Sequence, residues 1–529
     1  MRRLLLILVG AMALVLVAAI PIARRHMHVE AGMTNRHGFR ATLAAFGAIL
    51  GGHSAVAAPV PPTSFGVSLT APAYYRKTRM LANMAAAAWW GASDRHQLTS
   101  DEVDENGNVK KIAPGVTLTR ILTPPNVGTR NPTVRCTWKG KGDLKPATRR
   151  ATNIRFDQGG FTFAMNTDAP NGEAVSVELK LSSVDPSDPL RDIDCRETTM
   201  PASARFDPQF VESLKGFKVI RFMDWQDTNL NAPVTWATRH LPSGIDNIKG
   251  DGVAVEDLIA LTKETGAEPW FNMPWNADDD YYEHFARMVH DNLPADRTVY
   301  VELGNELWNH AFKAAGQAQQ EGQAASLSSN ANAAGLMRYA QRLGHVLDIW
   351  KKVYADRPGK LVRVASCQNG DWCVKTVLGF GDTARHVDAV ATAPYFGAKL
   401  NNTVFASPDD LFAALDPEIE RTLTNALAAK AVATQYGKRY ITYEAGQHLI
   451  FKDLDFEAKI ERDPRMYDAY SKYIDFWRTR IGDLMTFYAS VGSISRFGAW
   501  GLVEYVGQPI SETPKMRAVR DAMNRKSAH

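Results

Sequence analysis

The sequence predicts an α/β fold of the TIM-barrel class, a (β/α)8 barrel, with a β-sandwich-like domain inserted in the first β/α unit. From Asp207 onwards, short β-rich runs alternate with longer helical stretches up to the C-terminus. Between about residues 100 and 200 the runs are short and alternating, no helical period interrupts them, and Gly and Pro fill the gaps. No GxGxxG or phosphate loop follows any strand, which argues against a nucleotide-binding open sheet.

The eight expected strands are short runs rich in β-branched, aromatic and aliphatic residues. They are Phe65–Leu69, Lys218–Phe222, Glu268–Asn272, Tyr300–Leu303, Leu361–Ala365, Asp388–Thr392, Tyr440–Glu444 and Phe497–Trp500. The helices expected around them are Lys77–Trp90, Pro208–Leu214, Val255–Thr265, Asp279–Asn292, Leu336–Tyr354, Leu411–Tyr436, Met466–Phe487 and Lys515–Asn524. The Ala-, Gln- and Ser-rich residues 311–335 are expected to form a loop.

This pattern divides the chain into a targeting region at 1–57, the first barrel strand and helix at 58–100, the inserted β-rich domain at 101–205, and the remainder of the barrel at 206–529. The net charge is +4, but residues 1–57 hold six arginines against one glutamate, so the rest of the chain is close to neutral. No nucleic-acid partner is therefore expected. No Cys/His cluster has zinc spacing, and we expect a monomer without a metal or cofactor.

The N-terminus contains two segments with the character of a targeting signal. Leu4–Ile20 is a continuous apolar run flanked by arginines. Met33 opens a second pattern, in which basic residues precede the apolar stretch Ala41–Leu50 and the small-residue site Ala55–Ala57, as in a secretory signal. The first run is either an uncleaved membrane anchor or lies upstream of a true start at Met33. Both alternatives predict an exported protein, secreted or periplasmic, and we favour cleavage after Ala57.

Four cysteines fit an oxidising compartment. Cys367 and Cys373 are close in sequence, and Cys136 and Cys195 bracket one region of the insertion. Local pairing, Cys136–Cys195 and Cys367–Cys373, is the simplest of the three possible connectivities.

Two glutamates stand directly after short β-rich runs. Asn305 and Glu306 follow the strand that ends at Leu303, and Glu444 closes the run YITYE. One alternative for the first pair is a helix N-cap, with Asn305 as the cap and Glu306 in the first turn. The other is catalytic, because two carboxylates at the carboxyl ends of barrel strands can face each other across the mouth and cleave a glycosidic bond.

The motifs GNELWN at 304–309 and YEAGQHL at 443–449 resemble clan A of the retaining glycoside hydrolases. Within the clan they look most like secreted bacterial proteins described as cellulase-like or cellulose-binding. The resemblance covers the chain from Phe65 to about Asn524, without the insertion. It implies a (β/α)8 barrel with the acid/base at the end of strand 4 and the nucleophile at the end of strand 7.

The same resemblance assigns roles to individual residues. Glu306 matches the acid/base, Asn305 the amide that binds the sugar 2-hydroxyl, and Glu444 the nucleophile. Arg221 matches an arginine that hydrogen-bonds the nucleophile and keeps it ionised, and Tyr395 an aromatic hydroxyl that donates to it.

Further residues are expected to contact the sugar. Trp500, expected to end the eighth strand, matches the tryptophan under the sugar ring. The clan often has a histidine on strand 3 and another before the strand-6 tyrosine, where this chain has Asn272 and Ala393. Trp275 and Trp308 follow strand ends, and the alternatives for each are a further sugar subsite or the packing of a loop.

Two functions follow from these motifs. The first is a retaining β-glycoside hydrolase, endo-acting on a β-linked glucan or exopolysaccharide. The alternative is a non-catalytic carbohydrate-binding protein, such as a cellulose-binding one, on a degenerate glycosidase barrel. The presence of both glutamates favours the enzyme, because a barrel that only binds sugar has no chemical need for them.

Overall fold

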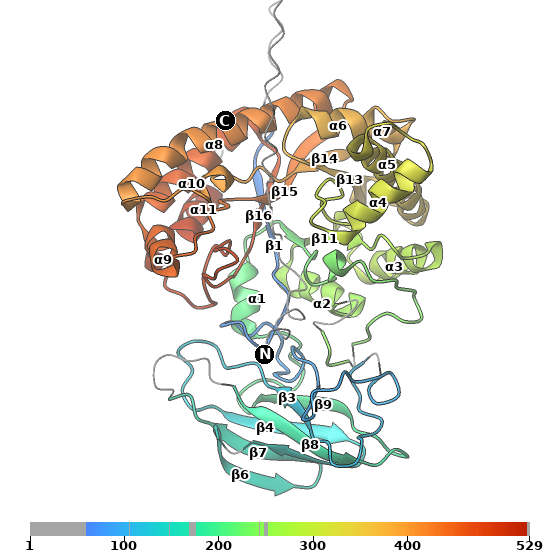
Figure 1. Cartoon of the computed structure of the whole chain (residues 1–529), viewed down its shortest axis with the longest axis vertical. Helices are drawn as coiled ribbons and strands as arrows, with labels where there is room; N and C mark the ends of the chain where they lie inside the picture. The colour runs from blue at the N-terminus through green and yellow to red at the C-terminus, as the bar shows by residue number, and fades with distance from the viewer. Residues whose placement is uncertain are drawn as a thin grey trace, which may run out of the picture.

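The structure is a computed structural model that describes residues 60–104, 106–147, 149–168, 176–242, 244–247 and 252–525. The expected targeting region at 1–57 lies outside these residues. Within them, no helix combines the length and the apolar character needed to cross a bilayer. Figure 1 shows two bodies, a barrel ringed by helices and a smaller pair of β-sheets beneath it.

Eight parallel strands close into a barrel, in the order in which they occur along the chain. Closure joins the last strand to the first, with Phe65 beside Met485, and the first strand also pairs with the second across the insertion, with Val67 beside Ile220. The strands are β1 (Ser64–Ser68), β10 (Val219–Arg221), β11 (Glu268–Met273), β12 (Val299–Leu303), β13 (Leu361–Cys367), β14 (Ala389–Thr392), β15 (Arg439–Ala445) and β16 (Leu484–Tyr488). The predicted TIM-barrel class is confirmed.

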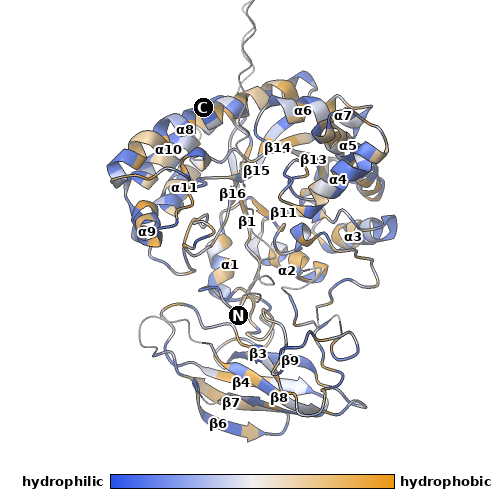
Figure 2. Cartoon of the chain, viewed as in Figure 1, coloured by the Kyte–Doolittle hydropathy of each residue, from blue (hydrophilic) through white to orange (hydrophobic). Residues whose placement is uncertain are grey.

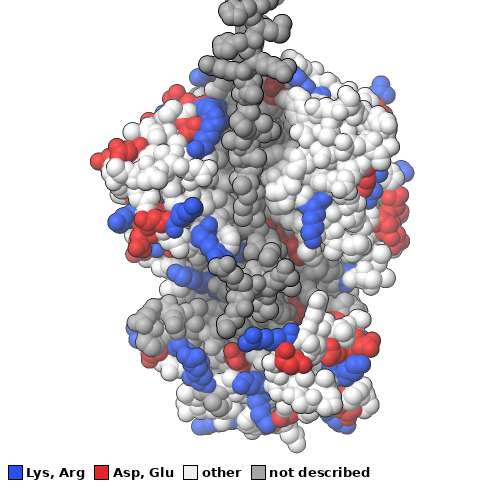
Figure 3. Space-filling model, in the orientation of Figure 1, with Lys and Arg blue, Asp and Glu red and all other residues white. Residues whose placement is uncertain are grey.

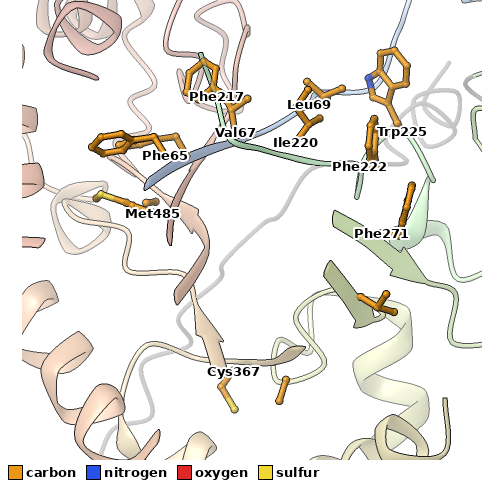
Figure 4. Packing of buried hydrophobic residues seen from close by; sticks show 14 of the residues in the cluster. Phe65, Val67, Leu69, Phe217, Ile220, Phe222, Trp225, Phe271, Cys367 and Met485 are labelled. Carbon is orange, nitrogen blue, oxygen red and sulfur yellow. The ribbon is translucent and has the colours of Figure 1, made fainter. Parts of the chain in front are cut away.

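Side chains on each barrel strand alternate between two apolar layers. One layer fills the barrel interior with residues such as Val219, Trp270 and Tyr300. The other packs between strands and helices, where Phe222 of the β10 end and Phe271 of β11 stack with ring centroids 5.6 Å apart (Figure 4). In Figure 2 the strands at the centre of the barrel are largely apolar, and the helices around them present mixed surfaces.

Helices connect the strands and cover the outside of the barrel (Figure 1). They are α1 (Pro208–Leu214), α2 (Val255–Thr265), α3 (Asp279–Asn292), α4 (Lys313–Ala324), α5 (Ala331–Val353), α6 (Asp371–Leu378), α7 (Thr383–His386), α8 (Pro408–Gln435), α9 (Leu454–Arg462), α10 (Arg465–Phe476) and α11 (Pro514–Asn524). Their ends follow local chemistry. Asp207 caps α1, and Gly266, in a left-handed conformation with φ of 74°, ends α2.

The helix expected at Lys77–Trp90 does not form, and the segment is a series of turns and isolated bridges. Its apolar residues Leu81, Met84 and Ala88 are buried as expected. The backbone, however, bonds to other segments, since the Met84 amide donates to the carbonyl of Cys195. Contacts across the barrel–insertion junction therefore replace the local helix ladder. A second correction concerns residues 311–335, which were expected to form a loop. They contain the helix α4.

The eighth strand was predicted in the wrong place. It is β16, Leu484–Tyr488, inside the stretch Met466–Phe487 that was expected to be one helix, whereas Phe497–Trp500 lies in the loop that follows. The helical stretch ends early because α10 passes into a short π-helix, Trp477–Ile481, and Gly482 with φ of 75° turns the chain. The residues of β16 are all apolar or aromatic apart from Thr486, so periodicity alone does not distinguish a buried strand from a buried helix.

Between β1 and β10 the chain forms two four-stranded antiparallel sheets, in the orders β2-β3-β8-β5 and β6-β7-β4-β9. One buried cluster contains residues of both sheets, among them Leu181 and Phe163. That this segment is a sandwich-like domain in its own right stays a prediction. The strands are β2 (Gly91–Ala92), β3 (Leu118–Ile121), β4 (Thr133–Lys139), β5 (Gly142–Pro146), β6 (Ala151–Asp157), β7 (Gly160–Met165), β8 (Glu178–Val184) and β9 (Arg191–Glu197).

Both predicted disulfides are present. Cys136 and Cys195 are direct neighbours on β4 and β9, so this bond joins two adjacent strands of one sheet. Cys367 ends β13 and bonds to Cys373 in α6, which fixes the loop after the fifth barrel strand.

The two chain segments that join the barrel to the sheets lie side by side. Leu81, on the way out, forms a bridge with Phe206, on the way back. The buried Arg79 guanidinium forms ion pairs with Glu197 at 2.7 Å and Asp207 at 2.6 Å. Because Asp207 also caps α1, one buried arginine ties the insertion to the first helix of the barrel.

Candidate active site

The top layer of the barrel interior is polar, although the layers beneath it are apolar. Arg221 lies two residues beyond Val219, and Glu302 two residues beyond Tyr300, so both side chains point into the barrel near its carboxyl end. Both side chains are completely buried. A buried charge is costly unless it is paired, so this layer must balance its own charges.

Arg221 supplies that balance. Its guanidinium donates to both carboxylate oxygens of Glu302 at 3.0 and 3.1 Å, to Glu444 Oε1 at 2.7 Å and to Asn305 Oδ1 at 2.9 Å. Burial lowers the pKa of Arg221, but the charges of Glu302 and Glu444 outweigh burial and hold it above the ordinary arginine value. One permanently charged guanidinium therefore fixes three side chains at the ends of two other strands, β12 and β15.

Glu444, on β15, has a donor on each carboxylate oxygen. Arg221 bonds to Oε1, and the Tyr395 hydroxyl donates to Oε2 at 2.9 Å. Tyr395 follows β14, the neighbouring strand, so adjacent strand ends hold this carboxylate in place. The structure brings Arg221, Tyr395 and Glu444 together as the sequence resemblance implied.

Glu306 is positioned by an unusual backbone turn. Its φ is 46°, in the left-handed region that a residue with a side chain rarely adopts, and such conformations concentrate at functional sites. Gly304, also left-handed at φ of 68°, begins the turn, and a Cβ there would lie 2.3 Å from Leu307 Cδ2. The helix N-cap alternative is wrong, because the next helix, α4, begins only at Lys313.

Two neutral donors hold the Glu306 carboxylate. The Tyr443 hydroxyl donates to Oε1 at 3.1 Å, and Asn309 Nδ2 donates to Oε2 at 2.8 Å. Tyr443 in turn accepts a bond from Trp308 Nε1 at 3.1 Å, and its ring lies 4.9 Å from the Arg221 guanidinium. Tyr443 therefore connects the surroundings of Glu306 with those of Glu444.

Burial raises the pKa of both site carboxyls, that of Glu444 to about 8. Arg221 and Tyr395 lower the pKa of Glu444, which is the expected direction, but burial and the charge of Glu306 outweigh them. Two carboxyls that repel each other titrate as a unit, so the pair retains a proton at neutral pH. Because the charged donor bonds directly to Glu444, we assign the negative charge to Glu444 and the proton to Glu306.

The predicted aromatic platform is formed differently from the expectation. Tyr488, not Trp500, ends the eighth strand, and its hydroxyl donates to Asp224 Oδ2 at 2.8 Å. Trp500 reaches the same place from the following loop, because its backbone carbonyl accepts from the Ala489 amide. Its ring lies 6.1 Å from that of Tyr488 and 5.6 Å from that of His448, which contacts Tyr395.

Asn272 and Trp275 require correction as substrate contacts. Asn272 is fully buried and donates to Glu302 and to the Gly304 carbonyl, so it supports the polar layer from the neighbouring strand β11. Trp275 is also buried, and its indole donates to Glu321 within the packing around α4. Trp308 is half-buried at the rim, where its ring nitrogen holds Tyr443.

Several members of the site were not predicted from the sequence. Tyr443 directly precedes Glu444, and in a regular strand two successive side chains lie on opposite faces. The pairing of β15 with β16 is irregular between Thr442 and Ala445, and this irregularity allows both side chains to reach the site. Asp224, a third mouth carboxyl whose pKa burial raises, follows β10 without a motif. The remaining unpredicted members are Glu302, Asn309, Asn229, which accepts from Asn305 Nδ2, and Tyr488.

Other features of the described residues give no second candidate site of comparable chemistry. Within the described ranges, no group of three or more His, Cys, Asp or Glu side chains has the arrangement of a metal site. On the face shown in Figure 3, Lys and Arg are interspersed with Asp and Glu, without a single-sign patch. The barrel mouth is therefore the place to which the chemistry points.

No family model matches the chain, and no curated protein sequence does. The chain is similar to an α-L-arabinofuranosidase from Thermotoga maritima in complex with arabinose, with a TM-score of 0.38 and 13% identity over 57% of this chain and 61% of that one. It therefore spans about three fifths of that relative's length.

Two further solved structures are similar. A Clostridium thermocellum xylanase 10B with CBM22-1 and GH10 modules has a TM-score of 0.37 and 10% identity, over 85% of this chain and 97% of that chain. A Bacteroidetes-affiliated GH5 cellulase has a TM-score of 0.33 and 13% identity, over 60% and 87%. The fold assignment rests on the closed barrel itself.

Proposed function

We propose that the protein is a retaining β-glycoside hydrolase that uses Glu444 as nucleophile and Glu306 as acid/base. The observation that carries the proposal is the pair of buried carboxyls at the ends of β15 and β12, one bonded to a charged donor and the other to neutral donors. The raised pKa values supply the proton that a general acid must hold at neutral pH.

The reaction is a double displacement. The Glu444 carboxylate attacks the anomeric carbon while Glu306 transfers its proton to the leaving oxygen, so the glycosidic bond breaks and a glycosyl ester of Glu444 forms. Glu306, now ionised, takes a proton from water, and the resulting hydroxide breaks the ester to give a product with the starting configuration. Asn305, beside Glu306, is placed to bind the sugar 2-hydroxyl.

Arg221 and Tyr395 are positioning residues in this mechanism. Arg221 holds one oxygen of Glu444 by a hydrogen bond and Tyr395 holds the other. Together they fix the direction from which Glu444 attacks the anomeric carbon. Tyr443 does the same for Glu306. Trp500 and Tyr488 form an aromatic wall at the mouth, and the apolar C–H face of a sugar ring packs on such a surface.

The proposed substrate is an internal linkage of a β-linked glucan or similar exopolysaccharide outside the cytoplasm. The two disulfides support export, because such bonds persist in oxidising compartments. The second candidate function is a carbohydrate-binding protein without turnover. Its supporting observation is the density of hydrogen bonds on both glutamates, which a binding site also requires.

The test is a panel of β-glucans, xylans, arabinans and aryl glycosides, assayed by reducing-sugar and dye release. We expect at least one substrate to be cleaved, with the first product in the starting anomeric configuration by proton NMR. A first product of inverted configuration contradicts the mechanism. Binding without cleavage of any member favours the second function.

A further inference from the structure

We infer that the pair of sheets has its own binding cleft for a neutral saccharide, separate from the barrel mouth. The inference takes the ligand class from the proposed function, but its geometry is independent. The cleft has a volume of about 350 Å³ and lies where β5, an edge strand of one sheet, meets β6, an edge strand of the other. It is lined by Trp138, Gly140, Gly142, Asp143, Leu144, Lys145, Phe156, Asp157, Gly159 and Gly160.

The observation that carries the inference is an inward-facing aromatic ring that the opposite sheet leaves uncovered. Phe156 pairs with Phe161 across β6 and β7, so both side chains lie on the same face of their sheet. Phe161 is fully buried in the cluster between the sheets, whereas Phe156 is 58% exposed. Trp138, two residues beyond the buried Cys136, belongs to the same face and is only half-buried.

The two accessible rings, Phe156 and Trp138, both contact the buried ring of Phe161. The centroid of Phe161 lies 5.6 Å from that of Trp138 and 5.6 Å from that of Phe156. Phe161, held by the core, therefore keeps the two accessible rings in fixed positions. A rigid aromatic face that needs no ordering on binding suits the apolar C–H face of a sugar ring.

The charged groups around the cleft select for a neutral ligand. Asp143 accepts from Lys145 Nζ at 2.9 Å and from the Ser182 hydroxyl at 2.6 Å. Asp157 accepts two bonds of 2.7 Å from Arg135. Each carboxylate thus has its own cation, so the lining offers hydrogen-bond acceptors and donors without net charge. Hydroxyl groups fit this lining, and the volume lies within the range of about 300–1,000 Å³ typical of ligand pockets.

The test compares full-length variants by native electrophoresis in gels that contain a mixed-linkage β-glucan, an arabinoxylan, an arabinan or the anionic polygalacturonate. All carry Glu444→Gln, so that the polymers stay intact and the barrel mouth is the same in each. Phe156→Ala and Lys145→Ala alter the cleft at exposed side chains, and Tyr436→Ala removes an exposed aromatic ring elsewhere, on the barrel. Thermal unfolding verifies that each variant is folded.

We expect retardation in at least one neutral gel, an apparent Kd at least tenfold weaker for Phe156→Ala, a smaller loss for Lys145→Ala, and no change for Tyr436→Ala. Retardation that is absent from every neutral gel, unaffected by Phe156→Ala and Lys145→Ala, or confined to polygalacturonate overturns the inference. So does a dimer of the chain that Phe156→Ala dissociates, because the cleft then binds a second copy.

The gels, taken together with cleavage assays of chains that keep Glu444, separate this inference from the proposed function. If the unsubstituted barrel cleaves no polysaccharide while Phe156→Ala still weakens binding, the cleft stands and the hydrolase fails. If a polysaccharide is cleaved and Phe156→Ala changes neither binding nor turnover of the polymer, the hydrolase stands and the cleft fails.

Discussion

The ends of β12 and β15 each present one buried glutamate, and the two differ in what holds the carboxylate. Glu306 and Glu444 are 6% and 5% exposed, so burial alone does not tell them apart. Glu444 receives a charged donor, Arg221, and the Tyr395 hydroxyl. Glu306 receives only neutral donors, Tyr443 and Asn309. The donors, rather than depth, therefore assign the negative charge to one carboxyl and the proton to the other.

Glu444→Gln is expected to have the largest effect. It keeps the size of the side chain but removes the attacking charge, so kcat should fall by about 10⁴-fold or more while binding survives. Dye release from aryl glycosides measures the first quantity and calorimetric titration with an oligosaccharide the second. Glu512→Gln, an exposed surface change, is the matched control. Near-normal turnover in Glu444→Gln rejects its role as nucleophile.

Glu306→Ala tests the other side of the comparison, and its effect should depend on the leaving group. Substrates with poor leaving groups need the proton, so their kcat/KM should fall by about 10³-fold or more, whereas activated aryl glycosides should suffer much less. Azide, a nucleophile that needs no general base, should restore turnover and form a β-glycosyl azide. The assignment fails if all leaving groups are affected equally and azide changes nothing.

Tyr395→Phe and Tyr443→Phe remove one hydroxyl from each carboxyl. Tyr395 lowers the pKa of Glu444, so its loss should move the acidic limb of the kcat/KM profile to higher pH. Tyr443 lowers the pKa of Glu306, so its loss should move the alkaline limb to higher pH. Activity should fall about 10- to 100-fold for Tyr395→Phe, which loses a bond to the charged Glu444, and about 2- to 10-fold for Tyr443→Phe, which loses a bond to the protonated Glu306. If both variants shift the acidic and alkaline limbs of the kcat/KM profile equally, the separate roles assigned to Glu444 and Glu306 are wrong.

The smallest expected effect is on stability. Burial raises the pKa of both Glu306 and Glu444, that of Glu444 to about 8, so between about pH 5 and 8 the folded pair keeps one proton that the unfolded chain releases. Stability should therefore fall as the pH rises through this window and level off above it. Glu306→Gln, which removes the carboxyl that holds this proton, should remove most of the fall, with a difference of about 1–3 kcal/mol at pH 8. Thermal unfolding from pH 4 to 9 measures it, and parallel curves for the two proteins refute it.

Much of the fold was predictable because local patterns and tertiary structure agree. Pro208–Leu214, Val255–Thr265 and Asp279–Asn292 have the predicted bounds, since caps and apolar spacing define them locally. The failures lie where long-range contacts decide. At 77–90 the backbone forms hydrogen bonds with the insertion instead of a helix. At 484–488 an apolar run forms a strand because its backbone pairs with β1 and closes the barrel.

The site was predictable where a residue stands in a motif at a strand end. Glu306, Glu444 and Arg221 were identified in this way, and the structure brings them together. Tyr443 and Glu302 were not, because their importance comes from partners on other strands. A buried carboxylate such as Glu302 is indistinguishable in sequence from an exposed one until the strand alternation around it is known.

The junction between barrel and sheets has a consequence for how the chain handles a long polymer. The outgoing segment leaves from the carboxyl end of β1, the rim that also carries Glu306 and Glu444, and the buried Arg79 ties it to the returning segment. If the sheets bind a polysaccharide as proposed, this tie keeps the polymer attached to the body that carries Glu306 and Glu444, and its other linkages meet them at a raised effective concentration. Chain length should then govern efficiency, with long polymers favoured over fragments too short to span both bodies.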